Sequence, residues 1–216
     1  RDYVRWLEFR RVLFRSIAGG INLALNSNNI DEIKEILTLM EKSVTKLDVF
    51  IMNMHDYYSL ERGELKIVDT DFKEIVNKLK DVYGIYSLSE NITFYTNVEQ
   101  NESFWSDEVY INLILTNLLS NAFKYQKKGG NNKSVSLDIK VNKGLAIIVI
   151  KDTGTGIDNK YKNEIFDLFF RAHVQEAGSG FGLFNVKSAL EKLNGKIEVD
   201  SIINEGTTFT VTIPHK

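Results

Sequence analysis

The 216-residue chain contains no cysteine, which excludes disulfides, thiolate catalysis and zinc sites built on cysteine. Its three histidines, at positions 55, 173 and 215, stand too far apart in the sequence to suggest a histidine metal cluster. The longest apolar runs, such as residues 145–150, are far too short to cross a bilayer, and no signal peptide is apparent. We therefore expect a cytoplasmic domain. Because residue 1 is arginine, we interpret the chain as a fragment, with any membrane attachment in segments outside it.

No charge of one sign dominates the chain. Its 27 basic and 29 acidic residues give a net charge of −2, which argues against electrostatic capture of nucleic acid. A hydrophobic content of 43% with 26% charged residues is ordinary for a globular protein. The length suits one large domain, or a modest domain with an appendage.

Residues 1–15 contain five arginines among bulky apolar side chains, without a clean apolar stripe. Two explanations stay open: a basic amphipathic helix, or sequence that is not native to the protein. Residues 16–25 are typical of the end of a helix, which the polar residues 26–29 close. We expect three parts: a non-matching segment at 1–15, a helical hairpin at 16–62 and a larger domain at 63–216.

The second helix of the hairpin has the most regular pattern in the chain. Asn29 and Glu32 stand at the spacing of a capping box, so we expect the helix to begin there. Apolar residues then follow in alternating steps of four and three: Ile33, Leu37, Met40, Val44, Leu47, Ile51, Met54 and Tyr58. This heptad spacing favours a hairpin that dimerises into a bundle over a single buried helix.

Beyond Gly63 the pattern changes to mixed α/β. Alternating or continuous apolar residues predict strands at 65–69, 92–98, 135–141, 145–151, 196–201 and 207–213. Helical spacing predicts helices at 72–82, at about 107–124 and from 182 onward. In the first of these, we expect Ile75, Leu79 and Val82 to face inward. Residues 154–179 have little strand character.

Two asparagines on the predicted helix 107–124 are candidate metal ligands. Asn117 and Asn121 lie one turn apart, so their amide oxygens share a face, and such hard oxygens suit Mg²⁺ held jointly with phosphate. Lys124 adds a cation, and Tyr125 adds a flat ring near the helix end. The alternative is an ordinary solvated polar face.

The segment DTGTGID, residues 152–158, directly follows an apolar strand. A carboxylate at that place, Asp152, can accept a hydrogen bond from an exocyclic amine such as that of adenine. Gly154 and Gly156 would let backbone and base approach closely. An ordinary Asp-Gly turn is the alternative.

Three glycines at alternate positions, Gly178, Gly180 and Gly182, run directly into a helix. Glycine permits close backbone approach, and a helix N-terminus favours an anion, so this pattern suits a phosphate, although glycines also form plain loops. Upstream, Phe166, Phe169 and Phe170 are expected to be core residues. Arg171 could reach a phosphate or a neighbouring subunit.

In this order the clusters resemble the N, G1, F and G2 boxes of histidine-kinase ATP-binding domains. The closing residues 206–214 resemble the third glycine box and last strand of that family. The resemblance covers residues 65–216, with a weaker match over 16–58. It implies an α/β (α+β) two-layer sandwich ATP-binding domain of the histidine kinase/Hsp90/gyrase type, preceded by a helical hairpin that dimerises into a bundle.

The resemblance also assigns roles. Asn117 and Asn121 would hold Mg²⁺, with Asn121 the more direct ligand, and Lys124 would approach the phosphates, so that Asn117 and Lys124 are the catalytic candidates. Thr208 would border the adenine pocket beside Thr207. The candidate ATP-binding residues are Asn121, Tyr125, Asp152, Gly154, Gly156, Ile157, Gly178, Gly180, Gly182, Leu183 and Thr207.

The implied activity is transfer of the ATP γ-phosphoryl group to a histidine, for relay to an aspartate of a response regulator receiver domain. The implied cofactors are ATP and Mg²⁺, and the implied partners are that receiver domain and a second copy of the chain. Two other hypotheses stay open: an ATPase or protein-serine kinase of the same superfamily, and a non-enzymatic dimeric nucleotide-binding scaffold.

The chain departs from the family at the phosphoacceptor. The family has a histidine followed by an acidic residue, with proline five positions after the histidine. Aligning residues 16–20 with the equivalent turn puts Glu8 in the histidine slot and Leu13 in the proline slot. No histidine precedes His55, which reads as a surface residue. We favour replacement of the native segment at 1–15 over a truncated or degenerate kinase, and we expect no autophosphorylation on the usual histidine.

Overall fold

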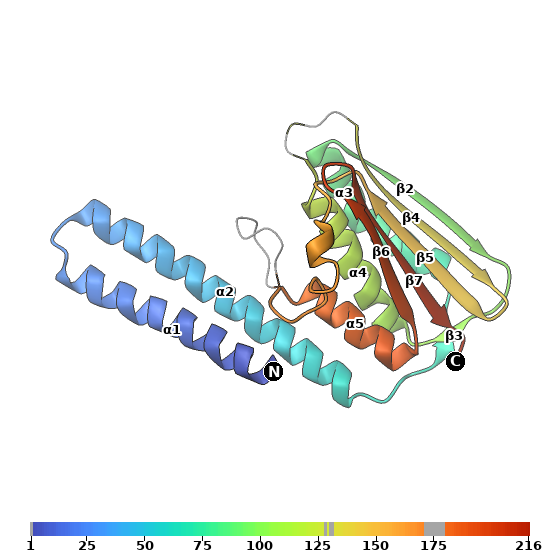
Figure 1. Ribbon diagram of the computed structural model, residues 1–216, viewed down its shortest axis with the longest axis horizontal. Coiled ribbons are helices and arrows are strands. Elements are labelled where there is room, and N and C mark those ends of the chain that lie inside the picture. The colour runs from blue at the N-terminus through green and yellow to red at the C-terminus, as the bar shows by residue number, and fades with distance from the viewer. Residues whose placement is uncertain (1, 128, 130–131, 171–179) are drawn as a thin grey trace.

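A computed structural model describes the backbone of residues 2–127, 129, 132–170 and 180–216. Side chains are described for these residues except 2–10, 46, 49–50 and 52–62. A long helical hairpin projects from an α/β body, in which the helices cover one face of a sheet (Figure 1). None of the helices in the described part of the chain is both long and apolar enough to cross a membrane.

The hairpin consists of α1 (Asp2–Asn26) and α2 (Ile30–Arg62), which pack along each other. Residues 2–15 continue the same helix as residues 16–26, so the described part of the arginine-rich segment is helical. Asn29 caps α2, since its Oδ1 accepts hydrogen bonds from the backbone N–H groups of Asp31 and Glu32 at 3.0 and 3.4 Å. The reciprocal half of the box differs: Glu32 accepts from Ser27 Oγ at 2.6 Å.

The heptad seam of α2 divides into two halves. Ile33, Met40 and Leu47, spaced by seven residues, are half-buried. The alternate members Leu37, Val44 and Ile51 are 51, 43 and 56% exposed. One half therefore packs within the chain, while the other presents an uncovered apolar row.

The body is built on a five-stranded sheet with the order β2-β4-β5-β7-β6. β2 pairs with β4 in parallel, and the other neighbouring pairs are antiparallel. Two hairpins, β4–β5 and β6–β7, supply four of the strands, at the places where the sequence predicts strands. The bounds are β2 (Ile92–Gln100), β4 (Lys133–Asn142), β5 (Leu145–Asp152), β6 (Lys196–Ile202) and β7 (Gly206–Pro214).

Three helices cover one face of this sheet: α3 (Phe72–Glu90), α4 (Glu108–Lys124) and α5 (Gly182–Leu193). Alternate residues of the central strands point at them and are almost fully buried, among them Leu137, Ile148 and Val211. Because the strand period is two, the intervening residues form an open, mostly polar face. The result is the two-layer sandwich that the family resemblance implies.

The helix at 72–82 is longer than expected and runs to Glu90. Val82, expected to face inward, is 59% exposed, whereas the next residue, Tyr83, is 7% exposed. The expectation for Val82 is therefore wrong. Tyr83 occupies the inward position because its ring stacks on Phe123 at 5.0 Å and its hydroxyl donates to the carbonyl oxygen of Thr116 at 3.1 Å.

A small second sheet joins the hairpin to the body. The predicted strand 65–69 is only β1 (Val68–Asp69), which pairs antiparallel with β3 (Trp105–Ser106), a strand that the sequence pattern did not indicate. Asp107 caps α4 through Oδ1, and its Oδ2 accepts from the backbone N–H of Lys66 at 2.7 Å. One buried carboxylate thus fixes both the linker and the helix that bears Asn117 and Asn121.

The hairpin also contacts the body near α5. Leu47 of α2 packs against a cluster of Leu168, Phe169, Phe181 and Phe184. Phe169 and Phe181 meet edge to face, with ring centroids 5.1 Å apart. The helical hairpin therefore meets the body at Phe181 and Phe184, which flank Gly182 at the start of α5.

Candidate functional site

Asp152 ends β5, and its side chain is only 7% exposed. Its Oδ1 accepts hydrogen bonds from the backbone N–H groups of Gly154 and Thr207, at 2.7 and 3.3 Å. Burial raises the pKa of the carboxyl group to about 6, and these two hydrogen bonds oppose the rise. Both of these bonds use Oδ1, so within the described part of the chain Oδ2 is left to accept from a ligand.

The loop after Asp152 packs directly on its neighbours. A Cβ at Gly154 would overlap the carbonyl oxygen of Tyr125, at the end of α4. Gly156 has a φ of +70°, and a Cβ there would overlap the carbonyl oxygen of Ile202. The backbone N–H of Thr155 donates to the backbone carbonyl oxygen of Tyr125 at 2.9 Å, so the loop is held against the end of α4. Glycine is required at both places, because a side chain would push the loop off its supports.

The turn between β6 and β7 meets Asp152 from the other side. Gly206 has a φ of +133°, and a Cβ there would overlap the carbonyl oxygen of Asp152. Thr207 is 6% exposed and lies opposite Asp152 in the sheet, while Thr208 lies opposite Lys151 and is half-buried. The structure thus brings Thr207, rather than Thr208, to the buried carboxylate.

Sequence reasoning missed Ser201, which is 8% exposed on β6. Its Oγ accepts from the backbone N–H of Ile157 at 2.8 Å, donates to the carbonyl oxygen of Gly206 at 2.9 Å and lies 3.0 Å from Thr207 Oγ1. One hydroxyl therefore holds three segments of the site together. The signal was present, because Ser201 interrupts the inward apolar alternation of Ile197 and Val199.

The two asparagines face the start of α5. Asn117 donates through Nδ2 to the carbonyl oxygen of Leu113 at 2.8 Å, which fixes its amide. A Cβ at Gly182 would lie 3.0 Å from Asn117 Oδ1 and 4.0 Å from Asn121 Nδ2. The absence of a side chain at Gly182 therefore keeps open the space beside both amides.

The N-terminus of α5 differs from those of α3 and α4. Asp71 and Asp107 cap α3 and α4 with their carboxylates, whereas the N-cap residue of α5, Phe181, makes no side-chain cap hydrogen bond. The first N–H groups of a helix have no partner within the helix and carry a partial positive charge. Together with the neighbouring asparagine amides, they form a setting that suits a phosphate.

Lys124, Ile157 and Leu183 are the remaining candidates whose contacts the structure describes. Lys124 Nζ donates to Tyr125 Oη at 3.0 Å and lies 4.5 Å from the centroid of the Tyr125 ring. Ile157 and Leu183 are half-buried and pack against the main core. Among these candidates, Ile157 and Leu183 are apolar and Lys124 carries the charge.

The phenylalanines at positions 166, 169 and 170 pack in the body, and Phe169 contacts the backbone at Gly180. Phe166 and Phe170 pack on the main core, as expected, and Phe169 joins the smaller cluster with Phe181. Gly180 has a φ of +74°, and a Cβ there would lie 2.8 Å from the backbone of Phe169, whose N–H donates to the Gly180 carbonyl oxygen at 3.1 Å. Gly178 and Arg171 lie outside the described residues.

The donor set fits a nucleotide-bound cation better than a protein-only metal site. Within the described ranges, no group of three or more histidine, cysteine, aspartate or glutamate side chains could hold a metal ion. Mg²⁺ is commonly bound through few protein ligands together with substrate phosphates and water. The amide oxygen of Asn117, facing the open space at Gly182, agrees with that mode.

We expect Gly206→Ala to lower the free energy of unfolding by more than about 3 kcal/mol, because its Cβ would overlap Asp152 and displace two strands. Gly129→Ala is the matched control: its φ is +74°, but a Cβ there meets nothing within 4 Å. That change should cost only about 1 kcal/mol. Denaturant unfolding of both variants measures the difference, and equal losses would contradict the close approach at Gly206.

A family model described as "Histidine kinase-, DNA gyrase B-, and HSP90-like ATPase" matches residues 106–216, which is more than half of the chain. Asn117, Asn121, Asp152, Gly182 and Thr207 all lie within that match.

Named relatives agree with it. The chain is 28% identical over 221 residues to the autoinducer 2 sensor kinase/phosphatase LuxQ of Vibrio parahaemolyticus, covering 95% of this chain and 25% of that relative. It is 29% identical over 192 residues to the sensor protein SrrB of Staphylococcus aureus, covering 85% of this chain and 32% of that relative. The chain thus spans about a quarter to a third of these relatives' length.

Solved structures agree as well. The mycobacterial sensor histidine kinase MprB matches with a TM-score of 0.57 and 27% identity, over 71% of this chain and 99% of that chain. The Acinetobacter baumannii histidine kinase AdeS shares the fold over 98% of both chains, with a TM-score of 0.69 and 19% identity. The solved structures that the chain resembles are thus histidine kinases, and the chain itself belongs to the family of histidine kinase-, DNA gyrase B- and HSP90-like ATPases.

Proposed function

We propose that the chain binds Mg-ATP between α4, the end of β5 and the start of α5, and transfers the γ-phosphoryl group to a histidine. The observation that carries this proposal is the approach of the uncapped α5 N-terminus, at Gly182, to the amides of Asn117 and Asn121. A helix N-terminus favours phosphate, and amide oxygens suit the cation that accompanies it.

The site has two chemically different ends. At the apolar end, Asp152 Oδ2 would accept a hydrogen bond from the adenine amino group, while Oδ1 stays bound to Gly154 and Thr207. At the other end, Asn117, Asn121 and the start of α5 would receive the phosphates and Mg²⁺. Lys124 lies at the C-terminal end of α4 and would leave Tyr125 Oη for a phosphate oxygen.

In the proposed reaction, a ring nitrogen of the acceptor imidazole attacks the γ-phosphorus, and the bond to the bridging oxygen of ADP breaks. Bound Mg²⁺ would neutralise charge on the phosphates. The chain's own residues position the nucleotide and stabilise the negative charge, which is the main contribution of a protein to phosphoryl transfer.

We also propose that the hairpin forms a homodimer. Leu37, Val44 and Ile51 form an uncovered apolar row at heptad spacing, which a second copy would bury as a helical bundle. A response regulator receiver domain is the proposed recipient of the phosphoryl group. The histidine kinase ThkA, which shares this fold with a TM-score of 0.71, is known in complex with the response regulator protein TrrA. We place the domain in the cytoplasm.

The chain contains no histidine before His55, so the test supplies the acceptor separately. We expect saturable ATP binding by calorimetry that tightens when Mg²⁺ is added. We also expect phosphate transfer from radiolabelled Mg-ATP to a separate histidine-bearing hairpin, with little ATP turnover in its absence. No binding at millimolar nucleotide would contradict the whole proposal. Steady turnover without the hairpin would favour an ATPase, and binding without any transfer would favour a scaffold.

A further inference from the structure

A cavity of about 570 Å³ lies away from the buried carboxylate and the glycine loops. It is bounded by the C-terminal half of α3, the end of α4 and the first residues of β2 and β4. Of the candidate nucleotide-site residues, only Lys124 reaches its lining. The volume is within the range of small-molecule sites, about 300–1,000 Å³.

The floor of this cavity is aromatic and uncharged. Tyr83 and Phe123 stack with centroids 5.0 Å apart, and Tyr83 Oη donates to the carbonyl oxygen of Thr116. Burial raises the pKa of Tyr83 to about 12, so its ring stays neutral at physiological pH. Val82 and Tyr86 continue the apolar surface outward and are 59 and 58% exposed. A flat apolar group would therefore gain burial against this floor.

The rim of the cavity is cationic. Lys127 and Lys133 line it beside Lys124, and Glu90 is the acidic residue in the described lining. Lys133 Nζ donates to the backbone carbonyl oxygen of Glu90 at 3.5 Å, and Lys124 is engaged with Tyr125 Oη. Within the described part of the chain, no carboxylate forms an ion pair with Lys127 or Lys133. An anionic group at the rim would therefore meet two ammonium groups without displacing a salt bridge.

We propose that this cavity is a second ligand site, separate from the nucleotide site, for a small amphipathic anion with an aromatic body. Its ring would lie against the exposed side chains of Val82 and Tyr86, beside the buried Tyr83 and Phe123, and its carboxylate or sulfonate would approach Lys127 and Lys133. Such a combination of an apolar floor with a few convergent polar groups is the usual form of a small-molecule site. Among the described residues, this site shares Lys124 with the proposed nucleotide site and no other candidate residue.

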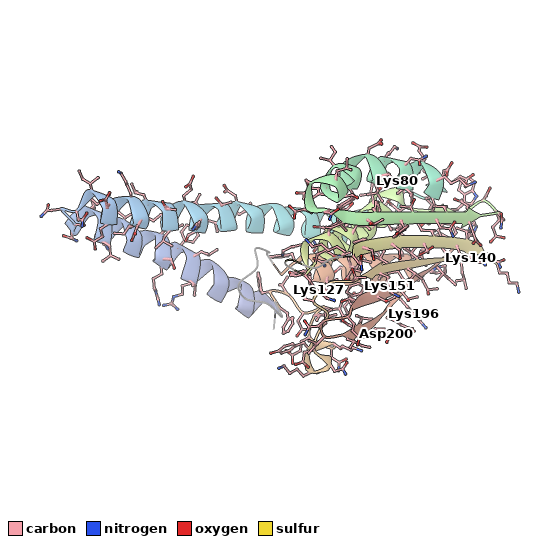
Figure 2. The ribbon with its side chains drawn as sticks, turned by 90° about the horizontal axis from the view of Figure 1, so that it is seen from above. Lys80, Lys127, Lys140, Lys151, Lys196 and Asp200 are labelled. Carbon is pink, nitrogen blue, oxygen red and sulfur yellow. The ribbon has the colours of Figure 1, made fainter. Side chains whose placement is uncertain are left out.

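The probe is 8-anilinonaphthalene-1-sulfonate, an aromatic sulfonate whose fluorescence rises in apolar surroundings. Titrated into the full chain with saturating Mg-ADP, it should bind saturably at one site. Lys127→Glu combined with Lys133→Glu should weaken binding at least fivefold. Lys140→Glu combined with Lys196→Glu changes the net charge equally at the other end of the sheet, and it should change the affinity less than twofold (Figure 2).

A steric variant makes the test independent of charge. Ser120 is exposed on α4 and lines the cavity, so the added ring of Ser120→Phe should occupy part of it and weaken saturable probe binding while the circular dichroism stays unchanged. Unchanged probe binding by Ser120→Phe would overturn the proposal. Equal weakening by the two lysine pairs, or stoichiometric displacement of the probe by Mg-ADP, would also overturn it.

Discussion

Replacing Asp152 by asparagine is expected to weaken ATP binding by about 10- to 100-fold, the range for losing one hydrogen bond to a charged group. In the structure, Asp152 Oδ1 is held by Gly154 and Thr207, which leaves Oδ2 for the ligand. In the asparagine variant the amide oxygen would keep the two backbone bonds, so the NH₂ group would take the place of Oδ2. A donor would then face the amino group of adenine, which is also a donor. Calorimetric titration of Mg-ATP measures the loss.

The same substitution is expected to stabilise the fold at pH 8. Burial raises the folded-state pKa of Asp152 from 3.8 to about 6, so the ionised carboxylate costs stability above pH 6, by roughly 2–3 kcal/mol. As the pH falls from 6 to 4, the folded protein takes up a proton before the unfolded chain does, and the cost disappears. Asp152→Asn should therefore raise the free energy of unfolding at pH 8 and much less at pH 4.

The control is Asp138→Asn, which makes the same chemical change at an exposed position on the open face of β4. It should leave nucleotide affinity unchanged. An Asp152→Asn variant that binds Mg-ATP as tightly as the parent chain would remove Asp152 from the proposed site. If Asp152→Asn instead lowered the free energy of unfolding at pH 8, the fold would have to stabilise the ionised Asp152 carboxylate of the parent chain.

Gly182→Ala is expected to lower Mg-ATP affinity about tenfold while leaving the fold at least as stable. The new Cβ would lie 3.0 Å from Asn117 Oδ1, in the space proposed for the cation and phosphates. Gly182 is the first residue of α5, and alanine within a helix is favoured over glycine by up to about 1 kcal/mol. Titrations with and without Mg²⁺ should show the larger loss in the presence of Mg²⁺, because the methyl group crowds the amide oxygen.

Gly84→Ala is the matched control, because Gly84 lies within α3 and a Cβ there meets nothing within 4 Å. It should leave nucleotide affinity unchanged. A double-mutant cycle of Gly182→Ala with Asn117→Ala should be strongly non-additive, since both changes act on one contact. Additive effects, or an equal loss with and without Mg²⁺, would contradict the proposed position of the cation.

The sequence pattern predicted every long strand and helix of the body, because apolar residues recur at a period of two in the strands and near 3.6 in the helices. It failed where two adjacent residues satisfied the same period. Val82 and Tyr83 both suit the inward face of α3, and only packing against Phe123 and Thr116 selects Tyr83. The two-residue strands β1 and β3 carry no period at all, so their pairing could not be read from the sequence.

In the candidate site too, some residues could be predicted from the sequence and others were found only in the structure. The glycine and asparagine boxes could be identified from the short spacings between their residues, which are visible in the sequence without the structure. Ser201 was missed because its role depends on contacts with Ile157, in the loop after β5, and with Gly206 and Thr207, at the start of β7. Likewise, the heptad seam of α2 predicts a partner, but only packing separates Met40 and Leu47 from the exposed Leu37, Val44 and Ile51.

By itself, the sequence determined the strands and helices of the body, the helical hairpin and the residue types that suit a nucleotide, because these follow from local periodicity and short spacing; the two-layer arrangement was implied by the family resemblance. The tertiary structure decided which of those residues meet. It buried Asp152 between two glycine turns and raised its pKa, and it brought the uncapped start of α5 to Asn117. It also created the aromatic cavity beside Lys127 and Lys133. Contacts between distant segments depend on how the whole core packs, and no local pattern records them.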